Sequence, residues 1–145
     1  MTEKNFLISL FFLISINLNA QDWFTNFSDA KELASKNDLN ILLVFQGSDW
    51  CGPCMKLDKK IWSTETFQIL SRDHFVMVQA DFPKRKSNQL SETLQIQNNH
   101  LADLYNKQGY FPLAVLLNPE GDILGKMGYE KILPTEYFNK LKSFE

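Results

Sequence analysis

The sequence Cys-Gly-Pro-Cys at residues 51–54 constrains this chain more than any other feature. It lies four residues after residues 40–46, a short and almost wholly apolar run. Such a run is typical of a strand covered on both faces, as in a parallel sheet. Pro53 fits the first turn of a helix, because no backbone hydrogen-bond donor is lost there. We therefore expect the two cysteines at a junction where a buried strand passes into a helix.

A thiol at the start of a helix can be nucleophilic at neutral pH. Cys51 would face unpaired backbone amides and the positive end of the helix dipole, and both stabilise a thiolate. Cys54 would follow one turn later on the same face, close enough to form a disulfide with Cys51 and release a bound substrate as a thiol. This exchange through a mixed disulfide is the reaction of dithiol oxidoreductases.

Three other interpretations of the cysteine pair are weaker. A zinc site needs four ligands, and the further candidates His74 and His100 lack ligand spacing to each other and to the cysteines. A purely structural bridge would close so small a loop that it would stabilise little. Two unrelated buried thiols would leave the intervening Gly-Pro unexplained. We expect no metal, and no cofactor other than a redox-active disulfide between Cys51 and Cys54.

The N-terminal segment predicts export. Residues 6–16 form an uncharged apolar run, preceded by Lys4 and followed by Ala20, a plausible cleavage position. This pattern indicates a signal peptide at residues 1–20 and a single domain at 21–145. The alternatives are an uncleaved anchor or a buried helix, although a bilayer span needs roughly 20 apolar residues. We expect no stable membrane insertion of the mature chain.

Composition and charge indicate one folded domain and argue against nucleic-acid binding. The chain has 145 residues, of which 44% are apolar, enough for one packed core. Its formal net charge is −2, and its longest basic cluster is the three residues 84–86. This charge gives no case for nucleic-acid binding, which usually shows a clustered excess of Lys and Arg.

Hydrophobic periodicity predicts alternating helices and strands. We expect strands at 40–46, 75–80, 113–117 and 122–127, with a turn at 118–121 joining the last two as an antiparallel hairpin. We expect helices at 23–37, at 55–61, from Ser63 or Thr64 to Leu70, at 91–107 with a break near 98–99, and at 135–144. This order predicts an α/β fold with a mixed sheet flanked by helices.

The motif Trp-Cys-Gly-Pro-Cys after an apolar strand, together with Phe111-Pro112 before a later strand, resembles the active site of the thioredoxin superfamily. The resemblance covers about residues 23–144 and implies a thioredoxin fold. It implies a thiol–disulfide oxidoreductase in which Cys51 attacks and Cys54, the more buried thiol, resolves the mixed disulfide.

The same resemblance implies a substrate groove. Pro112 would be a cis-proline whose backbone pairs with the substrate peptide, and Gly128 would lie in a loop lining the groove. The alternatives are an ordinary trans-proline and a simple turn. The candidate substrate-binding residues are Trp50, Gly52, Pro53, Phe111, Pro112, Gly128 and Tyr129.

The sequence also departs from the family pattern. Val44 stands where cytosolic thioredoxins carry a buried acid, and Met77 stands where they carry a lysine. The proton of the resolving thiol would have to pass to Asp49 or to water. Asp49 is alternatively a solvated loop residue.

The Gly-Pro between the cysteines resembles reducing members of the superfamily. We therefore expect a reductase of disulfides in exported proteins, supplied by an external thiol donor. The alternatives are an oxidase or isomerase of secreted proteins, which would use an external acceptor, and a non-catalytic binding module. Residues 45–50 and 81–83 resemble secreted and periplasmic members, which implies the periplasm or a secreted location.

Overall fold

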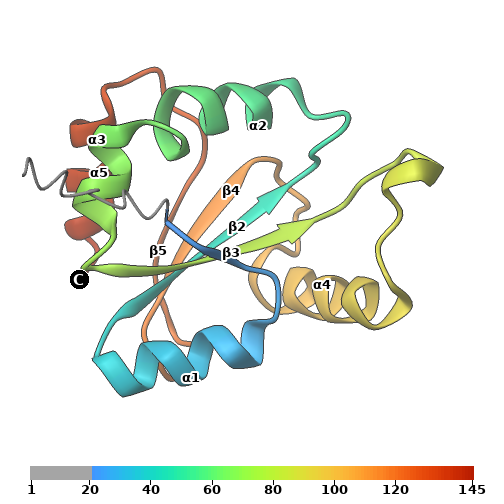
Figure 1. Cartoon of the computed structure of the whole chain (residues 1–145), viewed down its shortest axis with the longest axis horizontal. Helices are drawn as coiled ribbons and strands as arrows, with labels where there is room; N and C mark the ends of the chain where they lie inside the picture. Colours follow the sequence, from blue (N-terminus) through green and yellow to red (C-terminus); the bar gives the residue numbers. More distant parts are fainter. Residues whose placement is uncertain (1–20) are drawn as a thin grey trace, which may run out of the picture.

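The computed structural model describes residues 21–145, which form one mixed sheet with helices on both faces (Figure 1). The sheet has the order β1-β3-β2-β4-β5, in which β1, β3 and β2 are parallel, β4 is antiparallel to β2, and β5 is antiparallel to β4. The strands are β1 (Trp23–Phe24), β2 (Asn40–Gln46), β3 (Phe75–Asp81), β4 (Leu113–Leu117) and β5 (Ile123–Met127). The predicted mixed sheet and C-terminal hairpin are confirmed. The expected signal peptide lies outside the described residues.

The helices form two layers. Figure 1 shows α1 and α4 on one face of the sheet, and α2, α3 and α5 on the other. The helices are α1 (Phe27–Asn37), α2 (Gly52–Leu57), α3 (Glu65–Ser71), α4 (Glu92–Tyr105) and α5 (Pro134–Lys142). A π-helical stretch, Asp58–Trp62, continues α2, and a short 3-10 turn, Lys86–Asn88, lies between β3 and α4. No helix within residues 21–145 is both long and apolar enough to cross a bilayer.

Side-chain alternation along β2 divides the core into two clusters. Leu42 and Val44 point into the cluster beneath α2, α3 and α5. Ile41, Leu43 and Phe45 point into the cluster beneath α1 and α4. Because successive strand residues face opposite sides, a run that is apolar throughout fits a strand buried on both faces.

The structure corrects the predicted N-terminal helix. Trp23 and Phe24 form β1, where Trp23 pairs with Met77 and Phe24 with Val78. The helix begins after Asn26, whose side chain accepts a hydrogen bond from the Asp29 backbone N–H. Such a cap fixes where a helix starts, so the aromatic pair before it is free to join the sheet edge.

The predicted break near residues 98–99 is also wrong, because α4 is continuous there. Asn98 is buried, and its side-chain amide donates to the Asp81 backbone oxygen at 3.0 Å. This bond satisfies a polar side chain in the helix interior and ties α4 to the end of β3. Leu104, six residues later on the same helix, is half-exposed.

Other boundaries shift by a few residues. The helix expected at 55–61 starts at Gly52 and runs through Trp62 by way of the π-helical stretch. The C-terminal helix begins at Pro134 and ends at Lys142. In the hairpin, the pairing of β4 with β5 shifts register between Leu116 and Leu117.

Candidate active site

A tight turn after β2 places Cys51 at the start of α2. The backbone N–H groups of Trp50 and Cys51 donate to the Gly47 oxygen at 3.3 and 2.9 Å. A Cβ added to Gly47 would lie 2.2 Å from the Trp50 ring. The turn therefore needs glycine here, because the indole occupies the space that any side chain would take.

Cys51 and Cys54 are joined by a disulfide, with their Cα atoms 5.2 Å apart. Cys51 is the N-cap of α2, and its sulfur accepts a hydrogen bond from the Cys54 backbone N–H at 3.2 Å. The sulfur thus contacts a backbone amide that would stabilise a thiolate after reduction. The two residues are 4% and 5% exposed, so both are buried and the expected difference between them is not seen. Gly52 and Pro53 are exposed beside them.

Three aromatic side chains lie beside the disulfide turn. The Trp50 and Phe111 rings meet edge-on with centroids 5.5 Å apart, and Phe111 meets Phe82 at the same distance. The Trp50 indole N–H donates to the Phe82 backbone oxygen at 2.7 Å. Sequence reasoning missed Phe82, which lies at the start of a segment that otherwise reads as a polar loop. Its signal was an apolar residue directly after a buried strand.

Pro112 lies just before β4, and the Phe111–Pro112 peptide bond is cis. Pro112 is buried, and a Cβ on Gly128 would lie 3.7 Å from its backbone oxygen. The structure therefore brings Gly128 next to Pro112. It places Tyr129 elsewhere: Tyr129 packs against the core beneath α2 and lines a hollow of about 540 Å³ with residues that include Lys60.

The Asp49 carboxylate is hydrogen-bonded to the segment after β3. Its carboxylate accepts hydrogen bonds from the backbone N–H groups of Lys84 and Arg85, both at 2.9 Å, and from the Asn88 side chain at 3.0 Å. The Lys84 backbone N–H and the Asn88 amide are the main causes that lower the pKa of Asp49. A carboxylate with a lowered pKa is a weak proton acceptor. The geometry favours positioning of this loop over proton transfer.

A second hollow, of about 390 Å³, lies against Cys54. Its lining is largely polar and includes Gln46 and Gln79, whose side-chain amides are joined by a hydrogen bond of 3.2 Å. Asp58 supplies a carboxylate to this lining. Gln79 is the register partner of the buried Val44 across β2 and β3, and Gln46 lies two residues farther along β2. Both strands therefore supply polar groups near Cys54, although residue 44 itself is apolar.

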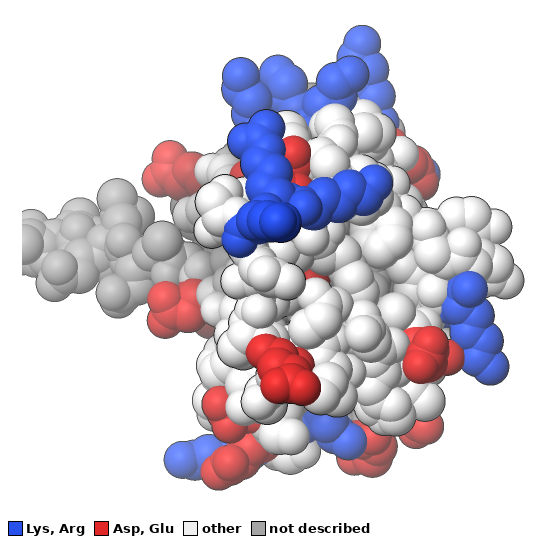
Figure 2. All heavy atoms as spheres, turned by 90° about the vertical axis from the view of Figure 1, so that its right-hand side faces the viewer, with Lys and Arg blue, Asp and Glu red and all other residues white. Residues whose placement is uncertain are grey.

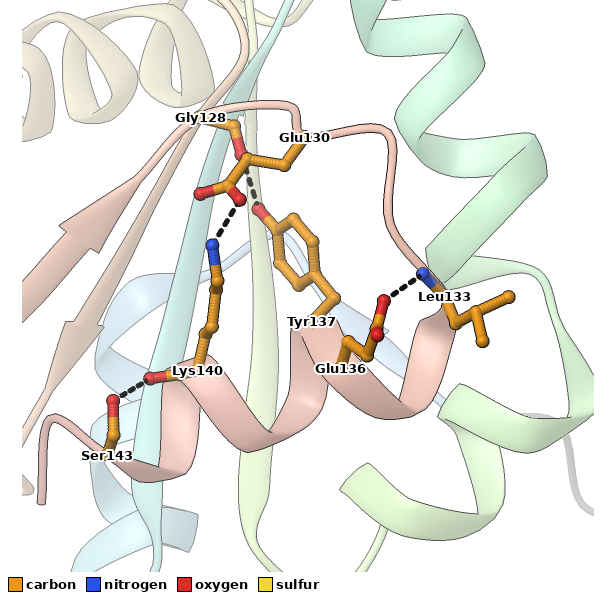
Figure 3. Close-up of polar contacts among 7 residues, drawn as sticks. All are labelled: Gly128, Glu130, Leu133, Glu136, Tyr137, Lys140 and Ser143. Atoms are coloured by element: carbon orange, nitrogen blue, oxygen red, sulfur yellow. Dashed lines mark hydrogen bonds and ion pairs between the residues drawn. The ribbon is translucent and has the colours of Figure 1, made fainter.

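The loop after β5 is held by α5 (Figure 3). The Tyr137 hydroxyl donates to the Gly128 backbone oxygen at 2.8 Å, and Lys140 forms an ion pair with Glu130. At the helix start, the Leu133 backbone N–H donates to the Glu136 carboxylate at 3.0 Å. Burial, reinforced by Glu130, raises the pKa of Tyr137 well above its ordinary value. The position of Gly128 thus depends on a buried, neutral phenol.

This phenol predicts a loss of stability at high pH. The unfolded chain releases the Tyr137 proton near the ordinary pKa of 10.0, whereas the folded chain retains it. The free energy of unfolding therefore falls as pH rises above 10, by up to about 1.4 kcal/mol per pH unit. We expect Tyr137→Phe to cost about 1 kcal/mol at neutral pH and to flatten this fall. Urea unfolding between about pH 8 and pH 11 measures both; parallel pH profiles for the two proteins would contradict the assignment.

Comparisons with known proteins agree with this geometry. A family model described as thioredoxin-like matches residues 22–119. The chain is 35% identical over 118 residues to the disulfide bond reductase DsbH of Chlamydia pneumoniae, covering 81% of this chain and 69% of that protein. It is 28% identical over 106 residues to the thioredoxin-related protein DsbJ of the same organism, covering 73% of this chain but 30% of that longer protein.

A solved structure of a DsbH oxidoreductase is also similar. It superposes with a TM-score of 0.78 at 32% sequence identity, covering 85% of this chain and 83% of the other. The layers described above are therefore those of a thioredoxin fold.

Proposed function

As a member of the thioredoxin-like family this chain is a thiol–disulfide oxidoreductase, and we propose that it works as a reductase of disulfides in exported proteins. The observation that carries the proposal is the position of Cys51 and Cys54 at the first turn of α2, where one sulfur caps the helix and the other lies within bonding distance. The disulfide between them is the only redox group that the proposed reaction uses.

The reaction begins from the reduced pair. The Cys51 thiolate attacks one sulfur of a substrate disulfide, so that a mixed disulfide forms and the other substrate sulfur leaves as a thiolate and takes up a proton. Cys54 then loses its proton and attacks the Cys51 sulfur, which releases the second substrate thiol. Two electrons have passed to the substrate, and the Cys51–Cys54 disulfide remains. An external thiol donor returns the pair to the reduced form.

The surroundings of the pair support these roles. The backbone amide on the Cys51 sulfur favours its thiolate as nucleophile and as leaving group. The polar hollow against Cys54 is roomy enough for water, which can take the Cys54 proton in the absence of an acid at Val44. Asp58 lies in the same lining and can accept that proton through water.

The substrate peptide binds beside the disulfide turn. Backbone pairing at Pro112 would hold the peptide extended across the pair. Trp50 and Phe111 offer an apolar contact on one side, and Gly128 leaves room for the peptide backbone on the other. Tyr129, which lines the separate hollow with Lys60, takes no part in this contact.

Export fits the N-terminal sequence. The apolar run at residues 6–16 has the form of a signal peptide, and an oxidising compartment supplies disulfides to reduce. We therefore place the protein in the periplasm or outside the cell, where it needs a donor to keep Cys51 and Cys54 reduced.

The redox direction predicts a low reduction potential. The similar DsbH is named a disulfide bond reductase, and Gly-Pro lies between the cysteines as in reducing members of the superfamily. We expect a potential near that of thioredoxin, about −270 mV, from equilibration with glutathione or dithiothreitol. A potential near about −120 mV, where strong oxidants lie, would overturn the reductase assignment.

A further inference from the structure

A basic loop borders the disulfide turn. We define the basic rim as Lys84, Arg85 and Lys86, which are all exposed in the segment between β3 and α4. The Lys84 ammonium lies 4.0 Å from the centre of the Trp50 ring. Such a cation–π contact holds the charge beside the indole without neutralising it. The first residue of the rim, Lys84, therefore contacts Trp50, which directly precedes Cys51 in the sequence.

The rim is fixed in place by Asp49. The carboxylate accepts both backbone N–H groups at Lys84 and Arg85, and it also holds the Asn88 side chain. Since Asp49 precedes Trp50, the same turn that presents Cys51 also sets the position of the rim. The hydrogen bonds that Asp49 accepts from Lys84 and Arg85 come from their backbone N–H groups, so the exposed ammonium and guanidinium groups are not used as donors in these bonds.

The rest of this end of the molecule is basic as well. The exposed lysines 56, 59 and 60 follow Cys54 on α2 and the π-helical stretch. Residues 48–62 and 81–90 together carry six Lys and Arg but three Asp, although the whole chain has a net charge of −2. Figure 2 shows Lys and Arg gathered over the upper part of this face. The disulfide turn is thus bordered by positive charge in a chain that is acidic elsewhere.

We propose that the basic rim selects substrates whose disulfide is flanked by acidic residues. This inference rests on the proposed reductase function and deepens it by naming a substrate class. Opposite charges within about a Debye length, about 8–10 Å in ordinary buffers, speed encounter and fix orientation. An acidic peptide lying across Trp50 would meet Lys84 first and then Arg85 and Lys86.

Three synthetic disulfide peptides test the proposal. They share one sequence and differ only at the positions flanking the disulfide, which are Glu, Gln or Lys. The pre-reduced protein is mixed with each peptide, and the second-order rate is divided by the rate with dithiothreitol to remove intrinsic reactivity. We expect the normalised rate for the Glu peptide to exceed that for the Lys peptide by about tenfold at about 20 mM salt. The ratio should fall below about threefold at about 300 mM salt.

A charge variant locates the effect. Arg85→Gln/Lys86→Gln should lower the Glu-to-Lys preference by at least about threefold while Lys84 and its contact with Trp50 stay. The matched control is Lys36→Gln/Lys107→Gln, which removes two exposed charges outside the basic end and should keep the preference.

The possible outcomes distinguish the proposed reductase function from the proposed preference for acidic substrates. Failure to reduce the Gln peptide faster than dithiothreitol would contradict the proposed function itself. Normal reduction of all three peptides at equal normalised rates would overturn only the acidic preference. Equal rates combined with rim-dependent binding to phosphatidylglycerol vesicles would assign the rim to a lipid surface, and would likewise overturn the proposal.

Discussion

Cys51→Ser is expected to lower disulfide reduction by at least about a thousandfold, because a serine hydroxyl cannot replace the thiolate nucleophile. Cys54→Ser should lower turnover to a similar extent for a different reason. Its Cys51 can still attack, since the helix start that stabilises the thiolate is unchanged. The mixed disulfide then has no resolving thiol and accumulates.

The two variants are distinguished by what they capture. Mass spectrometry of Cys54→Ser after incubation with a disulfide protein should show the substrate attached to Cys51, and dithiothreitol should release it. Cys51→Ser and the double variant are the matched controls and should capture nothing comparable. Far-ultraviolet circular dichroism checks that each variant is folded. Capture by Cys51→Ser in place of Cys54→Ser would exchange the proposed roles of the two cysteines.

Trp62→Ala is expected to lower the free energy of unfolding by about 3–5 kcal/mol, the usual cost of removing a buried tryptophan. Trp62 is 3% exposed, at the end of the π-helical stretch. Its ring meets Trp23, Phe67 and Tyr137 edge-on, with centroids 6.1, 4.9 and 5.2 Å away. The substitution therefore loosens β1, α3 and α5 together.

Guanidinium unfolding followed by circular dichroism measures this loss in the oxidised protein. Trp62→Phe keeps a ring in the cluster and should cost about 1–2 kcal/mol. Leu104→Ala serves as the control, because Leu104 is 50% exposed on α4, and it should change stability by about 0.5 kcal/mol or less. Equal midpoints for Trp62→Ala and Leu104→Ala would show that the aromatic cluster does not hold the three elements.

The sequence predicted the elements whose signals are local. The apolar runs at 40–46 and 113–117 form strands with the predicted bounds, because burial on both faces leaves little room for polar residues. The Asn-Pro-Glu-Gly turn at 118–121 joins the hairpin as expected. The cysteine pair was located for the same reason, since its spacing and the strand before it lie within fifteen residues.

Elements that depend on distant partners were missed. Trp23 and Phe24 fit the apolar face of the helix that follows, and only their pairing with Met77 and Val78 makes them a strand. Asn98 reads as a helix breaker until its bond to the Asp81 oxygen is known. In both cases the deciding contact crosses many residues of chain, where periodicity carries no information.

In the candidate site, too, residues in local motifs were predicted, whereas contacts with distant residues were not. Trp50, Phe111 and Pro112 could be named from motifs, and the structure brings them to one place. The orientation of Asp49 toward residues 84–88 could not be predicted. Asp49 follows β2, whereas its hydrogen-bond donors lie in the loop after β3. The hydrogen-bonded pair Gln46 and Gln79 was missed because each residue alone reads as the polar end of a strand.

The two sheet edges have a consequence for the proposed reaction with disulfide-bearing protein chains. Exposed edges invite intruding strands and aggregation. Here one edge is β1, with two residues, and the other is β5, where the register shift interrupts the ladder and the exposed Lys126 places a charge. Strand addition at either edge is therefore disfavoured. Under the proposed function, a substrate chain that pairs with the backbone beside Pro112 would not be drawn into the sheet, and it would leave once its sulfurs had been exchanged.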